Sequence, residues 1–217
     1  LPVTDAAPGV NAFLDAMRGS FAPVLGEDLN AAPMGSLSVE NSLWPENPFH
    51  LSAHEAARVG EEFEAAGRIW LGYYFEPRLI YAEPAFRKGP WKASDRRTVH
   101  LAVDVFTTEG TPMFAPLRGE VFVAEYRAGH LDYGGVIILR HQTSDGDPFY
   151  TLYGHLDPEF LDRLTVGQVI EKGEAFCRLG DPSMNGGWAP HVHFQLALTT
   201  EGIEADWPGV GDPDEMY

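Results

Sequence analysis

Cysteine is nearly absent from the chain, which has one, Cys177, among 217 residues. A single thiol cannot form an intramolecular disulfide, so the sequence excludes a small disulfide-rich domain. A chain of this length can bury a large hydrophobic core and does not need disulfide bonds to fold. Its composition, 44% hydrophobic and 22% charged residues, is ordinary for a globular protein. We therefore expect one large domain, or one domain with a substantial appendage.

Basic residues are scarce: 15 Lys and Arg stand against 32 Asp and Glu, for a formal net charge of −17. An acidic surface repels phosphate backbones and anionic headgroups. The charge balance therefore argues against nucleic acid or a lipid surface as a partner. No acidic run has the regular spacing of a calcium-binding loop.

Long apolar runs are missing too, and none approaches the ~20 residues that a membrane-spanning helix needs. The opening Leu-Pro-Val-Thr-Asp has neither the basic nor the apolar part of a signal peptide. The chain also lacks an initiating Met. We expect one of two origins: a leader was removed, which indicates the bacterial periplasm or cell envelope, or the chain was cut from a longer protein, which leaves the cytoplasm open.

Residues 1–95 mix helical and irregular pieces and predict an N-terminal α+β extension. The segment Asn11–Leu25 has the apolar spacing of a helix. A second helix is expected over Ala53–Ala66, with Ser52 as its N-cap in a capping box. The aromatic segment Arg68–Phe75 then has the composition of a strand.

Residues 96–217 form a second region, in which short apolar runs alternate with turns rich in Gly, Pro and Asp. The runs expected as strands are 99–106, 119–126, 136–141, 149–153, 174–179 and 191–198. Many short strands with frequent turns and no long helix indicate a mainly β domain, built as an antiparallel sheet or sandwich. No internal repeat or low-complexity segment is present.

The first chemically interesting strand runs from Val99 to Phe106. Side chains alternate along a strand, so His100 and Asp104 share one face with Ala102. In a flat strand these two residues would lie roughly 13 Å apart, too far to share a metal ion. The chain would have to bend or end near Asp104 for them to meet. An ordinary surface hydrogen bond is the alternative interpretation.

The second strand carries His191 and His193 on one face, with Val192, Phe194 and Leu196 expected to point inward. Two imidazoles at positions i and i+2 form a compact nitrogen cluster that suits zinc. A pair of exposed strand histidines is the competing interpretation, and this segment alone does not decide between them.

The third segment is Tyr153-Gly154-His155, at the end of an aromatic strand. We expect Gly154 to turn the backbone and to leave His155 accessible. A loop histidine bonded to a carbonyl is the alternative. Together, the three segments match the needs of a catalytic zinc site, which takes three protein ligands and keeps a position open, with further histidines free to move protons.

The same residues carry a family resemblance. The order His-x-x-x-Asp, Tyr-x-His-Leu and His-x-His-Phe resembles the lysostaphin-type zinc endopeptidases, metallopeptidase family 23. The segments 110–121, 135–141 and 166–173 match the family as well. The resemblance extends from Thr98 to Leu198, about half the chain, in the family's order and spacing.

The resemblance implies one zinc ion (Zn²⁺) per chain, bound by His100, Asp104 and His193. It implies that His155 and His191 are catalytic, His191 as the base and His155 as the group that stabilises the tetrahedral intermediate. The family fold is a mostly antiparallel sheet with a groove over the metal. Its usual substrates are peptide bridges in bacterial peptidoglycan.

The sequence departs from the family pattern in places. Ala102 stands where the family commonly has Gly. The loop 181–190 before His191 differs from the Ser-Thr-Gly and Thr-Gly-Pro motifs that are common in the family. We expect this loop to form one wall of the groove with Asn185 and Trp188. The acidic tail resembles a variant fused within larger bacterial proteins, beside parts that resemble small-molecule kinases and class III aminotransferases.

Two other classes compete with the peptidase. The segments around Lys172 also resemble lipoyl or biotinyl carrier domains, although such a carrier has no use for the five site residues. A peptidase-like module that has lost activity and binds a partner enzyme is the other candidate. Such modules usually lose zinc ligands, whereas all five positions are intact here. Metal content would separate the silent module from the enzyme, since stoichiometric zinc supports an enzyme.

The aromatic segment near residue 70 allows three roles. It could widen the substrate platform, cover the groove as an inhibitory segment, or complete the core of the sheet. The sequence leaves these three alternatives open.

Overall fold

The computed structural model of the protein describes residues 7–35, 69–86, 97–200 and 207–215, with four single positions between residues 54 and 61. The expected helix Ala53–Ala66 and its N-cap Ser52 lie outside the described residues, apart from those four positions. Within the described part of the chain, no helix is long and apolar enough to cross a membrane.

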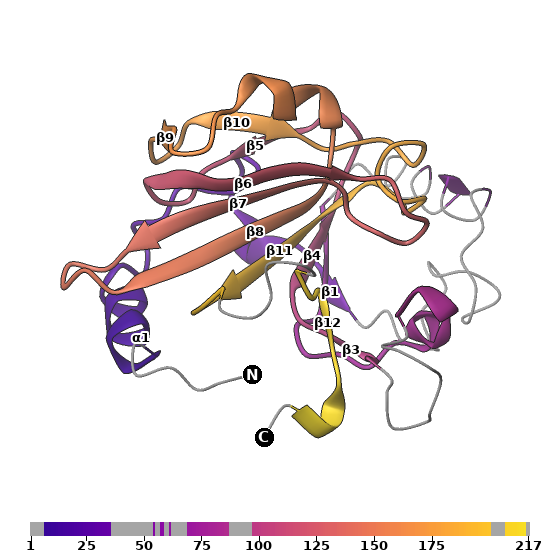
Figure 1. Ribbon diagram of the computed structural model, residues 1–217, viewed down its shortest axis with the longest axis horizontal. Helices are drawn as coiled ribbons and strands as arrows, with labels where there is room; N and C mark the ends of the chain where they lie inside the picture. Colours follow the sequence, from indigo (N-terminus) through magenta and orange to yellow (C-terminus); the bar gives the residue numbers. More distant parts are fainter. Residues whose placement is uncertain are drawn as a thin grey trace.

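An eight-stranded sheet forms the centre of the molecule (Figure 1). From edge to edge its strands are β1 (Met34–Gly35), β2 (Trp70–Gly72), β4 (Val103–Phe106), β11 (His191–Ala197), β8 (Pro148–Leu156), β7 (Gly134–Gln142), β6 (Gly119–Arg127) and β9 (Val169–Ile170). Every neighbouring pair is antiparallel except β1 and β2. The mainly β, antiparallel fold expected from the sequence is confirmed.

Two small antiparallel sheets accompany the large one. One pairs β10 (Ala175–Arg178) with β5 (Pro112–Phe114), and the other pairs β12 (Val210–Gly211) with β3 (Val99–His100). The main core lies between the large sheet and the β5–β10 pair, where Val105, Tyr153 and Val192 pack in one cluster with Met113 and Phe176. Because side chains alternate along a strand, the neighbours of those core residues in β4, β8 and β11 project from the opposite face.

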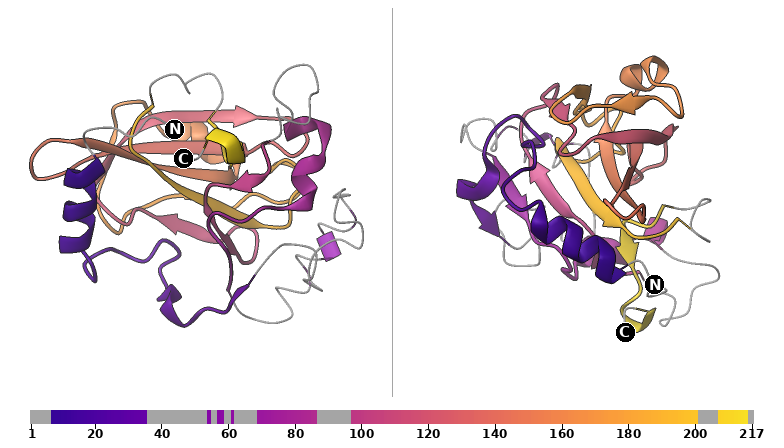
Figure 2. Two further views of the ribbon diagram at one scale, coloured as in Figure 1. Left: turned by 90° about the horizontal axis from the view of Figure 1, so that it is seen from below. Right: turned by 90° about the vertical axis from the view of Figure 1, so that its left-hand side faces the viewer.

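The helix α1 (Ala7–Ala16) packs Val10 against Phe149. The expected helix Asn11–Leu25 is therefore wrong in its bounds, because the chain turns after α1 and Gly19 adopts a φ of 82°. Short 3₁₀ helices span Leu29–Ala31, Leu79–Ala82, Pro84–Phe86, Pro158–Arg163 and Pro213–Glu215. Helix α1 and the segment 79–86 lie at opposite ends of the molecule (Figure 2).

The expected strand 99–106 is interrupted. The segment β3 ends at His100 and pairs with β12, whereas β4 begins at Val103 and joins the large sheet between β2 and β11. The chain thus bends between the first histidine and Asp104, as a shared metal site would require.

Two further expectations need correction. The aromatic strand 68–75 is reduced to Trp70–Gly72, and Tyr73, Tyr74 and Phe75 are exposed on a turn. Leu196, expected to point inward, is 44% exposed because it lies past the end of the pairing with β4, which stops at Phe194 opposite Val103.

The strand β2 comes from the N-terminal region and pairs with β4, which places Trp70 opposite Phe106 and Gly72 opposite Asp104. Strands from both regions of the chain therefore belong to one sheet. The boundary between an extension 1–95 and a domain 96–217 stays a prediction.

Candidate active site

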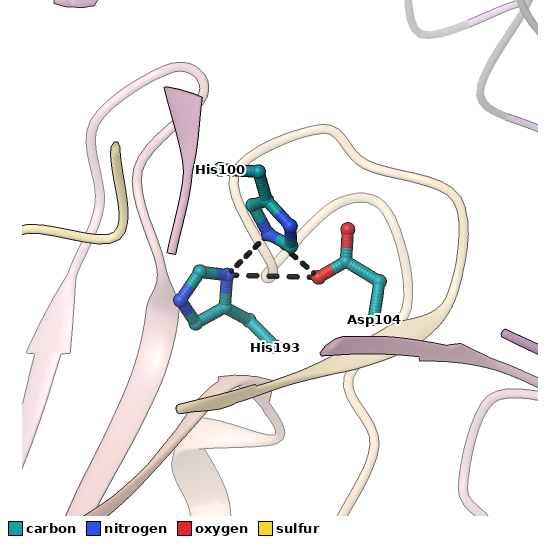
Figure 3. Close-up of side chains that lie close together, drawn as sticks. All are labelled: His100, Asp104 and His193. Carbon is teal, nitrogen blue, oxygen red and sulfur yellow. Dashed lines mark hydrogen bonds and ion pairs between the residues drawn. The ribbon is translucent and has the colours of Figure 1, made fainter. Parts of the chain in front are cut away.

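Three side chains converge where β4 and β11 lie side by side. In the register of these strands Asp104 is directly opposite His193, so their side chains leave the same face of the sheet. The bend after β3 adds His100, whose Nε2 lies 3.1 Å from Asp104 Oδ1 and 3.1 Å from His193 Nδ1. His193 Nδ1 is 3.6 Å from the same Oδ1. Figure 3 shows these three atoms facing one another. All three lie within 4.8 Å of one another.

Hydrogen bonds on the outer side of each imidazole fix which nitrogen faces the cluster. A backbone carbonyl can only accept, so His100 Nδ1–H points at Tyr73 O, 3.4 Å away, and Nε2 keeps its lone pair. Gln195 donates its amide to Pro208 O, which leaves its Oε1 to accept from His193 Nε2–H at 2.9 Å. His193 Nδ1 therefore also presents a lone pair.

Three acceptor atoms thus meet, and none of them supplies a proton to the others. Asp104 Oδ1 is buried and has no hydrogen-bond donor among the described residues. Such an arrangement is unfavourable by itself, because buried polar atoms are normally paired. A bound cation removes the conflict, so the residues present fit a metal ion.

Charge at the cluster is set by Arg78, whose Nη1 donates to Asp104 Oδ2 at 2.6 Å. Burial opposes the charged guanidinium, but Tyr81, Asp104 and Glu76 outweigh it and hold the pKa of Arg78 above its usual value. Burial also disfavours the Asp104 carboxylate, yet His100, when it is protonated, and Arg78 keep the pKa of Asp104 well below its usual range. The aspartate is ionised at neutral pH.

Burial, followed by the charge of Arg78, lowers the pKa of His100 to about 3. At neutral pH this imidazole is uncharged. A neutral imidazole beside an ionised carboxylate is the protonation state that binds a divalent metal.

The other two histidines lie beside the cluster with their rings 4.3 Å apart. His155 Nδ1–H donates to Asn185 O at 2.9 Å and His191 Nδ1–H to Ala189 O at 2.7 Å, so each keeps a lone pair on Nε2. His191 Nε2 is 3.7 Å from Asp104 Oδ1. Burial lowers the pKa of both imidazoles, with His191 and His193 adding to the effect at His155. Both are neutral and able to accept a proton.

The structure brings all five site residues proposed from the sequence together, although His155 differs from expectation in its surroundings. It is 5% exposed, not accessible, and the left-handed backbone conformation falls on His155 itself, with φ 65°, not on Gly154. Gly154 is needed for space, because a Cβ there would overlap the ring of Tyr133. The catalytic roles of these residues stay a prediction.

A cavity of about 140 Å³ opens beside the cluster. Besides the site residues, its walls include the aromatic side chains of Tyr81, Phe86, Tyr133, Trp188 and Trp207. The loop 181–190 contributes Trp188 to this wall, as expected. Asn185 does not line the cavity: it is fully buried, and its Oδ1 accepts from the backbone N–H of Trp188 at 2.9 Å, which fixes the loop.

Three residues that support the site were not predicted from the sequence. Gln195 could have been found, since alternation places it on the face of His191 and His193. Tyr133 packs against His193 and His155, but nothing in the residues around it points to the site. Arg78 could not be identified from the sequence, because it lies 26 positions before Asp104 in a segment without a recognisable motif.

Comparison with known proteins relates this site to a family. Residues 98–205 match the family described as Peptidase family M23. An uncharacterized metalloprotease of Haemophilus influenzae is 25% identical over 157 residues, which are 72% of this chain and 31% of that protein. The chain therefore spans about a third of the length of that relative.

Solved structures show similarity over part of the chain. The catalytic domain of the antimicrobial peptidase lysostaphin from Staphylococcus simulans matches with a TM-score of 0.43 and 24% identity, over 66% of this chain and 88% of that one. A zinc containing peptidase from Vibrio cholerae matches with a TM-score of 0.39 and 22% identity, over 54% of this chain and 35% of that one.

Proposed function

Residues 98–205 form a peptidase family M23 domain, so the chain is a metallopeptidase, and we propose that it is a zinc endopeptidase acting on bacterial peptidoglycan. The observation that carries this proposal is the convergence of His100 Nε2, His193 Nδ1 and Asp104 Oδ1 with no donor among them. Two imidazoles and one carboxylate are a donor set typical of catalytic zinc, which keeps a further position open for water or substrate.

Zinc bound there would act as a Lewis acid on a peptide carbonyl and would lower the pKa of a bound water to near neutrality. His191 is the proposed general base, because its Nε2 lone pair lies 3.7 Å from Asp104 Oδ1. The carbonyl of Ala189 holds the opposite N–H and stabilises the imidazolium that forms.

His155 is the proposed partner of His191. Its ring lies 4.3 Å away, and its Nε2 also presents a lone pair, so it stabilises an oxyanion only after it has gained a proton. We therefore propose that His191 accepts a proton from the attacking water and that this proton can pass to His155. One of the two imidazoles then donates a proton to the leaving amine of the cleaved peptide bond.

The substrate proposal rests on the family resemblance, which indicates cross-bridges or stem peptides of the cell wall. Such a substrate indicates action in the bacterial periplasm or cell envelope. If the chain is instead part of a larger fused protein, a cytoplasmic peptidase or a silent regulatory module is the alternative.

Digestion of purified peptidoglycan and of defined fragments, followed by mass spectrometry, tests the proposal. We expect new amino termini with the wild-type chain, and at least about 100-fold fewer in the same time with His191→Ala. The variant His54→Ala changes an exposed histidine outside the cavity and serves as the matched control. A zinc-loaded, folded chain that cleaves no fragment would support the silent module.

A further inference from the structure

A turn of the chain before the family-matched region wraps around the first metal ligand. Phe75 N–H donates to His100 O at 3.0 Å, and His100 N–H donates to Glu76 O at 2.9 Å. The carbonyl of Tyr73 faces His100 Nδ1. The ring of Tyr81 stacks on the imidazole, with centroids 6.2 Å apart. Residues 73–81 thus contact both the backbone and the side chain of this ligand.

Phe75 holds a backbone conformation that supports this arrangement. Its φ of 60° lies in the left-handed region, which a bulky side chain rarely adopts. Strained backbone of this kind persists where the surrounding structure fixes it, and it often occurs at functional sites. Here the strained residue makes the hydrogen bond to His100 O.

Arg78 extends the same turn to the second ligand. Its side chain is 2% exposed, and its guanidinium is shared between Asp104 Oδ2 at 2.6 Å, Glu76 Oε2 at 3.0 Å and the Tyr81 hydroxyl at 3.2 Å. Burying a guanidinium carries a desolvation penalty, and a buried ion pair is by itself weak evidence for a stabilising role. A role at the metal centre accounts for its presence.

The consequence for Asp104 is geometric. With Oδ2 occupied by Arg78, only Oδ1 faces His100 and His193, so the carboxylate can offer a metal one oxygen and not two. Residues that hydrogen-bond to the ligands of a metal site orient those ligands. Loss of such a residue typically lowers metal affinity 10- to 100-fold.

We propose that Arg78 is a positioning residue of the metal centre, and that residues 73–81, although outside the family-matched region 98–205, are an integral part of that centre. This inference rests on the proposed zinc site. Two physical effects of Arg78 oppose each other: it orients Asp104, and its positive charge repels a cation. The inference is that orientation outweighs repulsion.

The test compares full-length wild type with Arg78→Met and Arg78→Lys. Zinc affinity is measured by chelator competition, and the visible spectrum of the Co²⁺-substituted protein reports coordination number. We expect Arg78→Met to bind zinc about 10- to 100-fold more weakly. Its Co²⁺ absorption should weaken, because a freed Asp104 can use both oxygens.

Arg78→Lys separates charge from geometry. One ammonium on a flexible stem cannot reproduce the planar fork that joins Asp104, Glu76 and Tyr81. We expect an affinity between those of Arg78→Met and wild type. Wild-type affinity and spectrum in Arg78→Lys would show that charge alone matters and would overturn the positioning role.

Two gentler variants cover the case in which Arg78→Met does not fold. Glu76→Gln and Tyr81→Phe each remove one support of the guanidinium, and both should shift the Co²⁺ spectrum in the same direction by a smaller amount. Arg140→Met is the matched control, since Arg140 pairs with Glu120 away from the site, and it should leave affinity and spectrum unchanged.

The outcomes separate the two proposals. If wild type binds neither zinc nor Co²⁺, the proposed zinc site fails. If wild type binds both and the Arg78, Glu76 and Tyr81 variants keep its affinity and spectrum, or bind zinc more tightly, only the positioning role fails.

Discussion

At the scale of single residues, the hydrogen bond between Gln195 and His193 decides what the site can offer a metal. Gln195 is itself fixed by Pro208 O, so its Oε1 has one role, to accept the proton on His193 Nε2. A free imidazole would exchange tautomers and would present a lone pair on Nδ1 only part of the time. Gln195 therefore prepares His193 before a metal arrives.

We predict that Gln195→Ala lowers zinc affinity about 10- to 100-fold, since the tautomer and the ring orientation of His193 are no longer fixed. Chelator competition measures the change, and Leu196→Ala, at an exposed neighbouring position, is the control. Unchanged affinity in a folded Gln195→Ala protein would show that His193 is oriented by its other contacts.

Replacing His191 or His155 by Ala should lower turnover by about 10² to 10⁴, the usual contribution of a general acid or base. Zinc should stay bound in both variants, because neither residue belongs to the convergent set His100, Asp104 and His193. Steady-state cleavage of a peptide substrate and metal analysis of the same samples provide the test. Loss of zinc in His155→Ala would mean that it is a ligand and that the roles are misassigned.

At the scale of elements, the interruption between β3 and β4 creates the site. Alternation along 99–106 places His100 and Asp104 on one face and shows that a bend is needed. It does not show where the bend falls, because β3 ends in a pairing with β12, about 110 positions later in the chain. Local pattern fixes which residues share a face, whereas distant pairing fixes whether they meet.

The role of Arg78 could not be predicted from the sequence. Its contacts depend on β2 pairing with β4 and on the turn that follows β2, and neither is encoded in the spacing of nearby residues. The histidine strand 191–198 was predicted more fully, since its alternation, its pairing face and its two imidazoles all lie within one segment.

The strand β2 supports a prediction about residues 1–95. Trp70 and Leu71 are each 8% exposed, and Tyr81 is 5% exposed, so these side chains complete the core. A chain beginning at Asp95 would expose Val105 and Phe106 along the freed edge of β4. We expect it not to fold, as judged by circular dichroism and thermal unfolding.

Other outcomes of that experiment would favour the other two roles. A soluble shortened chain with higher activity would mean that the segment inhibits. A soluble chain with weaker substrate binding would mean that it forms a platform, for which the exposed Tyr73, Tyr74 and Phe75 are suited.

At the scale of the whole molecule, buried histidines make stability depend on pH. The histidines whose pKa is lowered in the folded state, chiefly by burial, are His100, His141, His155 and His191. Below about pH 6.5 the unfolded chain binds protons that the folded chain does not. Their contribution to stability is therefore complete above pH 6.5 and is lost as the pH falls.

We predict that the unfolding free energy of the metal-free protein drops between about pH 6.5 and pH 5, with a slope of up to about 1.4 kcal/mol per pH unit for each of these histidines that stays neutral in the folded chain. Urea unfolding at several pH values, with a chelator present, measures the slope. A flat profile over this range would contradict the burial of these imidazoles in the neutral form.

The metal centre is tested by the zinc content of the purified chain and of two ligand variants, measured by elemental analysis. The convergence of His100, Asp104 and His193 predicts one zinc per wild-type chain and a sharp fall in both His100→Ala and His193→Ala. Full zinc content in both variants would contradict the metal centre on which the proposed peptidase mechanism depends.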